Sequence, residues 1–506
     1  MKRKDYIIAL DIGTTSTKGM LIDLQGNIHD LHSISYQAYY PEENKVEQDP
    51  EDVFQAVIKV IHFLINKNRI NARLISALSF SGILNSMIPV DHNCTPLTRA
   101  LIWADSRSIE ESDYLRQNLD IGQVKNRTGC TIHPMYFLPR LLWFKEKEPN
   151  IFRKAYKFIS VKEYVLYKLY GDFIVDRSIA SGTGILNMST IDWDIDLLKY
   201  IGMSYERLSK IVETTYIMKG LNAKYADEMG LLSGTPGIVG ASDGALAHLG
   251  SVGLSDNEMS ITIGTGAALR RRVSSPVILK EGEAWCYYMA ENNWLLGGII
   301  QDAGIVMKWF SDTFISETDD REKFLLMNEY AEEIKPGSDG LLFFPSLGGE
   351  RCPHDNPHLR GAVLGLSFNH NIKHLARALM EGISYRLYSV YKMLTYDRDM
   401  ELVVSGGILK SPAWLQLVSD FFGKTLWKVK VQEASTWGAF IIGLRALGII
   451  NSLDEVNNYV SKRNKIEPNI KNFNIYRNLY NSYNSVYEEV VNASSKINKR
   501  KNLTRE

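Results

Sequence analysis

Two short Gly/Thr segments, each after an apolar run, carry residue types suited to holding phosphate. Residues 11–18 have the sequence Asp-Ile-Gly-Thr-Thr-Ser-Thr-Lys, and residues 262–266 have Thr-Ile-Gly-Thr-Gly, with Thr262 roughly where Asp11 stands. Glycine permits a tight turn, and hydroxyls and backbone amides donate to phosphate oxygens. We therefore predict two phosphate-binding β-hairpins that clamp one nucleotide. An ordinary hairpin with a polar turn is the alternative for either segment alone.

A single acid, Asp243, stands where an apolar run gives way to a helical pattern. Residues 236–242 are apolar or small, and glycines flank the acid at positions 240 and 244. A carboxylate at such a strand-to-helix junction can lie bare in a cleft and accept a proton. The structural alternative is an N-cap, worth about 1 kcal/mol to the helix.

A third group of chemistry-bearing residues lies nearer the N-terminus. Trp103, Asp105 and Arg107 alternate after an apolar strand end, and Asn85 follows the small residues that end a second core strand, 74–82. On one side of an extended segment, an aromatic ring, an acid and a base could line a polyol pocket. A local ion pair between Asp105 and Arg107 at a strand edge is the alternative.

The elements that must position these residues alternate between strands and helices. After the first hairpin, Asp49 caps a predicted helix with apolar residues at helical spacing from Val53 to Ile65. Further strands are predicted at 295–298 and 402–407, with helices through 304–309 and from about 412 to 422. The repeated hairpin favours two related α/β domains facing a cleft. Residues 476–491 are expected to form a surface helix, and 492–506 a frayed tail.

Composition narrows the function. At 506 residues, two or three domains are expected. Acidic and basic residues balance at 58 each, which argues against nucleic acid or a membrane surface as partners. No signal peptide or apolar span is evident, and the four cysteines have no paired spacing, so we expect a cytoplasmic protein.

Two further motifs show that the chain resembles the FGGY family of carbohydrate kinases, within the actin-like ATPase superfamily. The family's C-terminal signature fits residues 361–366 and 374–381, which a seven-residue spacer separates. The N-terminal signature fits residues 139–143, with Arg140 where lysine is usual. The resemblance implies an α/β fold of two ribonuclease H-like domains around a central cleft, each a five-stranded mixed sheet, closing by hinge motion. The implied division is 1–252, 253–450 and a polar C-terminal helix and tail, 451–506.

The resemblance also assigns roles. Asp243 would be the catalytic base, and Asp11 would hold Mg²⁺. The residues expected around ATP are Asp11, Gly13, Thr14, Thr15, Lys18, Thr262, Gly264, Thr265, Gly266, Gly304, Gly406, Gly407 and Ser411. Those expected to contact the acceptor are Asn85, Trp103, Asp105, Arg107, His133 and Asp243.

Within the family the chain is most similar to the gluconate kinases, through residues 102–107, 129–135, 240–244 and 348–353. Two departures bear on the substrate: Asn85 replaces the usual histidine, and Gln301-Asp302 replaces two asparagines. We expect ATP-dependent phosphorylation of D-gluconate to 6-phosphogluconate. Xylulose, another pentulose or a polyol are alternative acceptors, and an actin-like ATPase acting as a binding module is the rival from another class. A homodimer is compatible with the resemblance.

Overall fold

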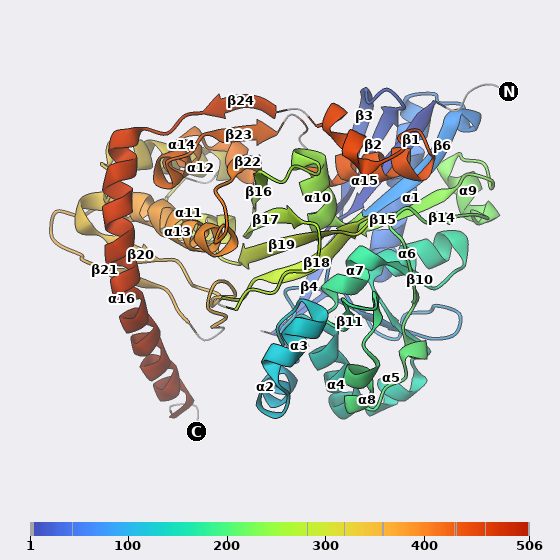
Figure 1. Cartoon of the computed structure of the whole chain (residues 1–506), viewed down its shortest axis with the longest axis horizontal. Coiled ribbons are helices and arrows are strands. Elements are labelled where there is room, and N and C mark those ends of the chain that lie inside the picture. Colours follow the sequence, from blue (N-terminus) through green and yellow to red (C-terminus); the bar gives the residue numbers. More distant parts are fainter. Residues whose placement is uncertain are drawn as a thin grey trace.

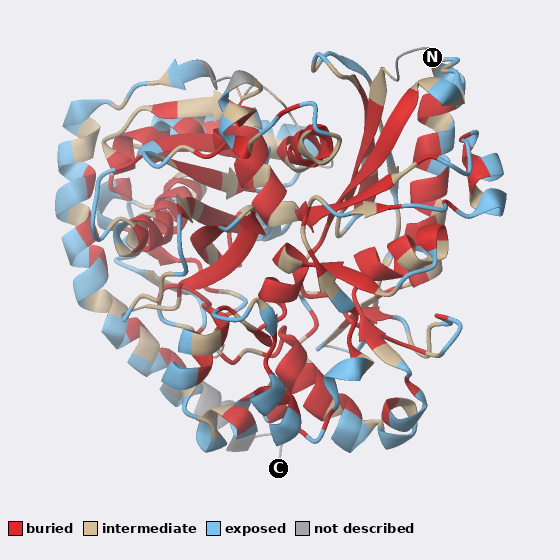
Figure 2. Cartoon of the chain, turned by 45° about the vertical axis from the view of Figure 1, so that its right-hand side comes forward, coloured by how far each residue is buried: buried red, intermediate tan, exposed pale blue. Residues whose placement is uncertain are grey.

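The computed structural model describes residues 5–42, 44–280, 282–317, 319–356, 359–429, 431, 433–460 and 462–503. Two large mixed sheets with flanking helices form the two halves of the molecule (Figure 1). Most strands of both sheets are buried (Figure 2). None of the helices in the described residues is both long enough and apolar enough to cross a membrane.

The N-terminal sheet has six strands. In spatial order they are β14 (Ile217–Met218), β15 (Gly237–Ser242), β6 (Ile75–Gly82), β1 (Tyr6–Ile12), β2 (Ser16–Asp23) and β3 (Ile28–Ser35). β1 is antiparallel to β2 and parallel to β6, which is parallel to β15. The carboxyl ends of β1, β6 and β15 therefore meet at one edge, where open α/β sheets bind ligands.

The C-terminal sheet has seven strands and repeats this pattern. Its order is β18 (Trp285–Ala290), β19 (Asn293–Ile300), β17 (Ala267–Val273), β16 (Glu258–Ile263), β22 (Glu401–Gly406), β23 (Leu426–Val429) and β24 (Lys462–Ile466). β16 is antiparallel to β17 and parallel to β22, as β1 is to β2 and β6. The five strands β19-β17-β16-β22-β23 thus match β3-β2-β1-β6-β15.

The expected two-domain fold is confirmed, but five strands per sheet is wrong for the described residues. β14 pairs antiparallel with β15, β18 with β19, and β24 with β23. Each added strand covers an edge of the five-stranded core, whose backbone groups would otherwise lack partners.

Helices cover both sheets. α1 (Pro50–Lys67), capped by Asp49, buries Val53, Phe54 and Val57 against the N-terminal sheet. The C-terminal half has the helices α11 (Gly304–Phe314), α12 (Asp320–Glu333), α13 (Ile372–Leu394), α14 (Pro412–Phe422) and α16 (Ile470–Leu503), besides one described below. It also has a small hairpin, β20 (Leu342–Phe344) and β21 (Ala362–Leu364). Short 3₁₀ turns span Ala72–Leu74, Tyr205–Arg207, Ser338–Gly340, Gly407–Lys410 and Leu453–Asn458.

Two helices between the sheets join the halves: α10 (Asp243–Val252) and α15 (Ala434–Ala446) (Figure 1). They touch backbone to backbone, because a Cβ on Gly250 would lie 2.1 Å from the Ala434 carbonyl oxygen and one on Gly438 2.1 Å from that of Leu246. α15 also reaches the N-terminal sheet, where Ser79 Oγ donates to the Ala439 carbonyl over 2.6 Å. Glycine at both helix contacts allows α15 to pack closely against α10.

A cap built mainly from residues 83–216 lies beside the N-terminal sheet. Its helices are α2 (Ile109–Asn118), α3 (Ile121–Thr128), α4 (Phe137–Lys147), α5 (Pro149–Lys154), α6 (Val161–Tyr170), α7 (Arg177–Gly182) and α8 (Ile195–Tyr200), and α9 (Ala223–Met229) follows it. Its short strands are β4 (Ala38–Glu42), β5 (Lys45–Gln48), β7 (Ile88–Val90), β8 (Ala100–Leu101), β9 (Lys157–Ile159), β10 (Ile174–Asp176), β11 (Leu186–Asn187), β12 (Asp192–Trp193) and β13 (Lys210–Val212).

Two local predictions are wrong. Residues 101–107 were expected to be extended, but β8 ends at Leu101 and the chain then turns, with the Asp105 amide donating to the Ile102 carbonyl over 3.0 Å. The C-terminal helix extends to Leu503, beyond the start of the expected tail at Asn492. Residues 504–506 of that predicted tail lie outside the described residues.

Candidate active site

A cavity of about 260 Å³ lies where the cap, the N-terminal sheet and the C-terminal sheet meet. Of the residues singled out from sequence, it is lined by Asn85, Trp103, Asp243, Thr262, Gly264 and Gly266. Apolar walls come from Leu84, Met135, Trp285, Leu295 and Ile299. The cavity therefore brings the predicted base, part of the acceptor set and the second hairpin together.

Asp243 is the first residue of α10, and Ser242 is the N-cap, its hydroxyl accepting from the Ala245 amide. The N-cap alternative for Asp243 is therefore wrong. The Asp243 carboxylate accepts from the Gly244 amide over 2.6 Å and lines the cavity. Burial, with repulsion from Asp11, raises the pKa of Asp243 to about 6. Such a carboxylate is ionised at neutral pH yet more basic than an exposed one, as a general base requires.

A buried ion pair supports β15, the strand that ends directly before Asp243. Lys162 Nζ donates to the Asp176 carboxylate over 2.8 Å and to the Ala241 carbonyl over 3.0 Å. Ser178 Oγ lies 2.9 Å from Ser242 Oγ. The end of β15 is thus fixed by α6 and α7, which limits where the base can point.

Asp11 lies at the end of β1 and receives a hydroxyl on each oxygen. Ser81 Oγ donates to Oδ1 over 2.6 Å from β6, and Ser435 Oγ donates to Oδ2 over 2.7 Å from α15. Both hydroxyls stabilise an ionised carboxylate, whose oxygens keep further lone pairs for a metal or its waters. The C-terminal half thereby helps to orient an acid of the N-terminal sheet.

The turn of the first hairpin directs its carbonyls toward the protein. The Gly13 carbonyl accepts from Tyr36 Oη over 2.6 Å, the Thr15 carbonyl from the Tyr36 amide over 3.1 Å, and the Thr14 carbonyl from Gln48 Nε2. The Gly13 amide donates to the Ser16 carbonyl within the same turn, over 3.0 Å. Lys18 pairs with Glu433 over 2.6 Å at the start of α15, which leaves its charge partly neutralised.

The second hairpin has the same construction with a hydroxyl in place of the acid. Thr262 Oγ1 lies 3.0 Å from Ser405 Oγ, as Asp11 lies against Ser81. A Cβ on Gly264 would meet no atom of the described residues within 4 Å, so this turn has open space beside it. The Gly304 and Ile305 amides donate to the Gly264 and Thr265 carbonyls, both over 2.9 Å.

Other predicted nucleotide residues lie around this turn. Gly406, with φ of +92°, pairs with Ile263, and a Cβ there would lie 2.5 Å from the Ile263 carbonyl oxygen. Gly407 follows it. Ser411 is buried, caps α14 and donates to Asn328. Its hydroxyl is therefore engaged within the protein.

The residues of the two hairpin turns, together with Asp11, fit a nucleotide with Mg²⁺. In the described residues, no group of three or more His, Cys, Asp or Glu side chains could hold a metal. A single carboxylate at Asp11 suits Mg²⁺, which binds through one or two carboxylates plus phosphate oxygens and water. The open space at Gly264 and the inward carbonyls of the first turn suit phosphate groups.

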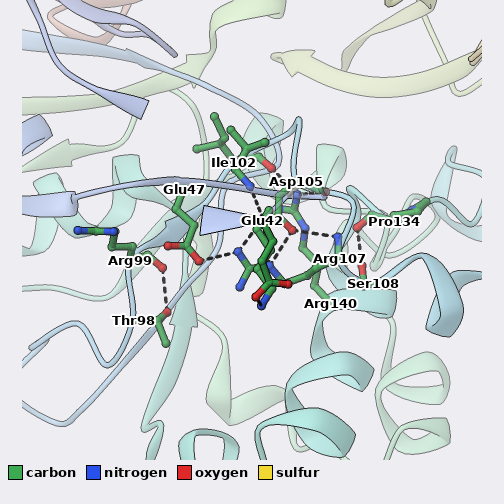
Figure 3. Close-up of polar contacts among 12 residues, drawn as sticks. Glu42, Glu47, Thr98, Arg99, Ile102, Asp105, Arg107, Ser108, Pro134 and Arg140 are labelled. Atoms are coloured by element: carbon green, nitrogen blue, oxygen red, sulfur yellow. Dashed lines mark hydrogen bonds and ion pairs between the residues drawn. The ribbon is translucent and has the colours of Figure 1, made fainter. Parts of the chain in front are cut away.

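Asn85 and Trp103 reach the cavity because Arg140 holds their backbones. The buried Arg140 guanidinium donates to the carbonyl of Asn85 over 2.6 Å. It also donates to the carbonyls of Asp105, over 3.2 Å, and Ile102 (Figure 3). Asn85 has φ of +58°, and its buried Oδ1 has no hydrogen-bond partner among the residues that the structure describes. Trp103 Nε1 donates to Thr14 Oγ1 over 3.1 Å, joining the cavity to the first hairpin.

Asp105, Arg107 and His133 are not among the residues that line the cavity. The Arg107 guanidinium lies between Asp105, at 2.7 Å, and Glu47, at 2.6 Å (Figure 3). Two carboxylates thus neutralise the cation that was expected to meet the acceptor. Burial and the nearby Arg351 charge lower the pKa of His133 well below its usual value, so this imidazole is neutral.

Sequence reasoning missed two cations that do line the cavity, Arg270 and Arg351. Arg270, on β17, lies against Gly244, where a Cβ would be 3.2 Å from its Nε, and it donates to Thr262 Oγ1 over 3.3 Å. Arg351, from the loop after β20, donates to Tyr136 Oη of the cap over 2.8 Å. The run of three arginines on β17, residues 270–272, was the available signal for Arg270. Arg351 stood within a motif used only for the family resemblance.

Comparison with known proteins places the chain in a family. The N-terminal domain of the FGGY family of carbohydrate kinases matches residues 6–250, and its C-terminal domain matches residues 259–447. The chain therefore belongs to the FGGY family of carbohydrate kinases, as its motifs indicated.

Individual relatives cover nearly the whole chain. A gluconokinase of Bacillus subtilis (strain 168) is 37% identical over 95% of this chain and 97% of its own length. The crystal structure of a gluconate kinase from Lactobacillus acidophilus aligns with a TM-score of 0.91 at 31% identity, covering 97% of this chain and 99% of that one. A ligand-bound xylulose kinase from the same organism aligns equally well, with a TM-score of 0.91, 32% identity and the same coverage.

Proposed function

We propose that this carbohydrate kinase transfers the γ-phosphoryl group of ATP to the primary hydroxyl of D-gluconate, giving 6-phosphogluconate. The observation that carries the proposal is the placement of Arg351 and Asp243 in one cavity. A six-carbon sugar acid has its reacting hydroxyl at one end and its carboxylate at the other. It therefore calls for a base and a separate cation, which Asp243 and Arg351 supply. Relatives named gluconokinase support the same acceptor.

In the proposed reaction, the hydroxyl oxygen attacks the γ-phosphorus, the bond to the β,γ-bridging oxygen breaks and ADP leaves. The hydroxyl proton passes to the Asp243 carboxylate, whose pKa of about 6 leaves it ionised at neutral pH. Turn amides of both hairpins and the Arg270 guanidinium stabilise the charge on the transferred group. Mg²⁺, held through Asp11, would neutralise phosphate charge when bound.

A neutral pentulose is the second candidate, and a specific observation favours it. The cavity walls are largely apolar and Asn85 cannot become cationic. A xylulose kinase is also as similar in fold as the gluconate kinase. The acceptor's carboxylate separates the two candidates, because only a sugar acid needs Arg351.

The test is an acceptor panel of D-gluconate, D-xylulose and glycerol with ATP and Mg²⁺, on the wild type, Asp243→Ala and Arg351→Gln. We expect gluconate to have the highest kcat/KM and Asp243→Ala to lose turnover. Arg351→Gln should lower kcat/KM for gluconate by about 10- to 100-fold, the value of a hydrogen bond to a charged group, with little change for neutral sugars.

The matched control is Arg116→Gln. Arg116 also joins the cap to the loop after β20, through Asp355, but it does not line the cavity. A pentulose that outperforms gluconate, or an equal loss on acidic and neutral acceptors in Arg351→Gln, contradicts the proposal. ATP hydrolysis indifferent to every acceptor would favour a binding module.

A further inference from the structure

The C-terminal helix α16 lies outside both matched family domains, which end at residue 447. It runs along the outer edge of the C-terminal half, beside α13, β20 and β21 (Figure 1). Four tyrosines recur on it at spacings of four, three and four residues: Tyr476, Tyr480, Tyr483 and Tyr487. Such spacing places them on one face of a helix.

The first three tyrosines anchor the helix to the C-terminal core. Tyr476 Oη donates to Glu381 over 2.9 Å, and Tyr480 Oη lies 2.9 Å from Ser389 Oγ. The Tyr483 ring stacks on Tyr385 with centroids 4.4 Å apart. Because these rings are largely buried, the helix is a packed part of the fold rather than a loose appendage.

The fourth tyrosine reaches the loop that forms the active cavity. Tyr487 Oη donates to the Glu350 carboxylate, and its ring lies 4.9 Å from that of His354. Glu350 precedes Arg351 and is only 2% exposed. Its other carboxylate oxygen lies 3.7 Å from Arg386 Nε.

The Glu350 carboxylate is therefore held from two sides. Arg386, on α13, has buried nitrogens with no hydrogen-bond partner within the described structure. Its charge faces Glu350 and also lies near Asp302. Asp302 in turn accepts from the Gly348 amide over 2.8 Å, at the start of the same loop. Tyr487 supplies the contact that comes from α16.

We propose that α16 fixes the position of Arg351 through the Tyr487–Glu350 hydrogen bond, so that Tyr487 and Glu350 are positioning residues for acceptor binding. Loss of the tyrosine hydroxyl frees the Glu350 carboxylate to turn toward Arg386. The backbone at Arg351, one residue on, then shifts, and the guanidinium no longer meets the acceptor where Tyr136 now holds it. The inference rests on the proposed function in that Arg351 contacts the acceptor.

The experiment compares Tyr487→Phe with Tyr480→Phe in the full-length protein. Both variants remove one hydroxyl from the same face of α16, but Tyr480 contacts α13 and not the loop. We expect Tyr487→Phe to raise the acceptor KM three- to tenfold with kcat and the KM for ATP within twofold. Tyr480→Phe should leave all three unchanged, with a similar change in Tm for both variants.

A double variant tests the route of the effect. If Tyr487 acts through Arg351, Tyr487→Phe adds nothing to the acceptor KM once Arg351→Gln is present. An unchanged KM in Tyr487→Phe, or fully additive effects in the double variant, overturns the inference.

Failure of the proposed function has a different signature. KM values are measured with the best acceptor of the panel. A wild type that prefers a pentulose overturns only the assignment of gluconate if Arg351→Gln still raises the KM for that pentulose. An Arg351→Gln effect without a Tyr487→Phe effect overturns only the role of α16. No effect of Arg351→Gln on any acceptor overturns both.

Discussion

Replacing the proposed base by its amide, Asp243→Asn, should abolish turnover and stabilise the protein at neutral pH. Burial and repulsion from Asp11 raise the pKa of Asp243 from 3.8 to about 6, against the attraction of Arg270 and Lys162. The fold therefore penalises the charged form. An asparagine has no such charge, and its oxygen can still accept from the Gly244 amide.

The direction and size of the expected change in stability follow from the linkage between proton binding and folding. The pKa of this carboxyl is higher in the folded state than in the unfolded state, so protonation favours folding. Its contribution to the free energy of unfolding is therefore fully present below pH 3.8 and is lost as the pH rises through about 6. Two pH units at 1.36 kcal/mol each give an upper bound of about 3 kcal/mol. Because Asp243 is half-buried and faces the cavity, solvent screening lowers our expectation to about 1–2 kcal/mol.

The assay is thermal unfolding of the ligand-free wild type and Asp243→Asn between pH 4 and pH 8. We expect the variant to gain about 1–4 °C in Tm above pH 6, and the gain to vanish near pH 4. The control is Asp113→Asn, at an exposed position on α2, with a change near zero throughout. A variant equal to or less stable than the wild type at pH 8 would refute the electrostatic reasoning for the base.

Three further predictions concern other parts of the site. The kcat/KM of the wild type should fall tenfold per pH unit below about pH 6, because only ionised Asp243 accepts the proton, and a flat profile from pH 5 to pH 8 would contradict this role. Gly264→Ala should raise the KM for ATP while leaving Tm unchanged, since its Cβ would meet no atom of the described residues within 4 Å. Gly240→Ala should instead fail to fold stably, since its Cβ would lie 1.7 Å from the Phe80 carbonyl oxygen. Titrating ATP and recording Tm for both separates the two effects. Arg140→Met should lower the unfolding free energy by several kcal/mol by leaving buried carbonyls unpaired, at about 1–3 kcal/mol each, and Arg140→Lys should recover part of it in a denaturant titration.

The two hairpins could be predicted from sequence because each is local. A strand, a Gly/Thr turn and a strand lie within 18 residues in the first hairpin and within 16 in the second, and both segments form the predicted hairpins. The edge strands β18 and β24 were not predicted because pairing with β19 and β23 depends on the assembled sheet. The tyrosine spacing in α16 was visible in the sequence, although the helix was expected only on the surface.

The pocket expected from Trp103, Asp105 and Arg107 shows why alternation alone misleads. Asp105 turns away because it accepts from the Val46 amide over 2.8 Å, and Arg107 follows it to reach Glu47. Both partners lie about 60 residues earlier in the chain. No pattern within residues 101–107 could report these contacts, so the charged pair was placed in the wrong environment.

The same contrast explains why the residues expected around phosphate are easier to predict from sequence than those expected around the acceptor. Phosphate is expected to contact backbone turns, and glycines in the sequence indicate where such tight turns can form. The acceptor cavity instead uses side chains that distant residues hold: Asn85 depends on Arg140, Trp103 on Thr14, Arg270 on Thr262, and Arg351 on Tyr136. A substitution at a supporting residue can therefore move a cavity side chain while every lining residue stays the same. Differences in acceptor preference among relatives of this fold should then be sought in these supports as well as in the cavity wall.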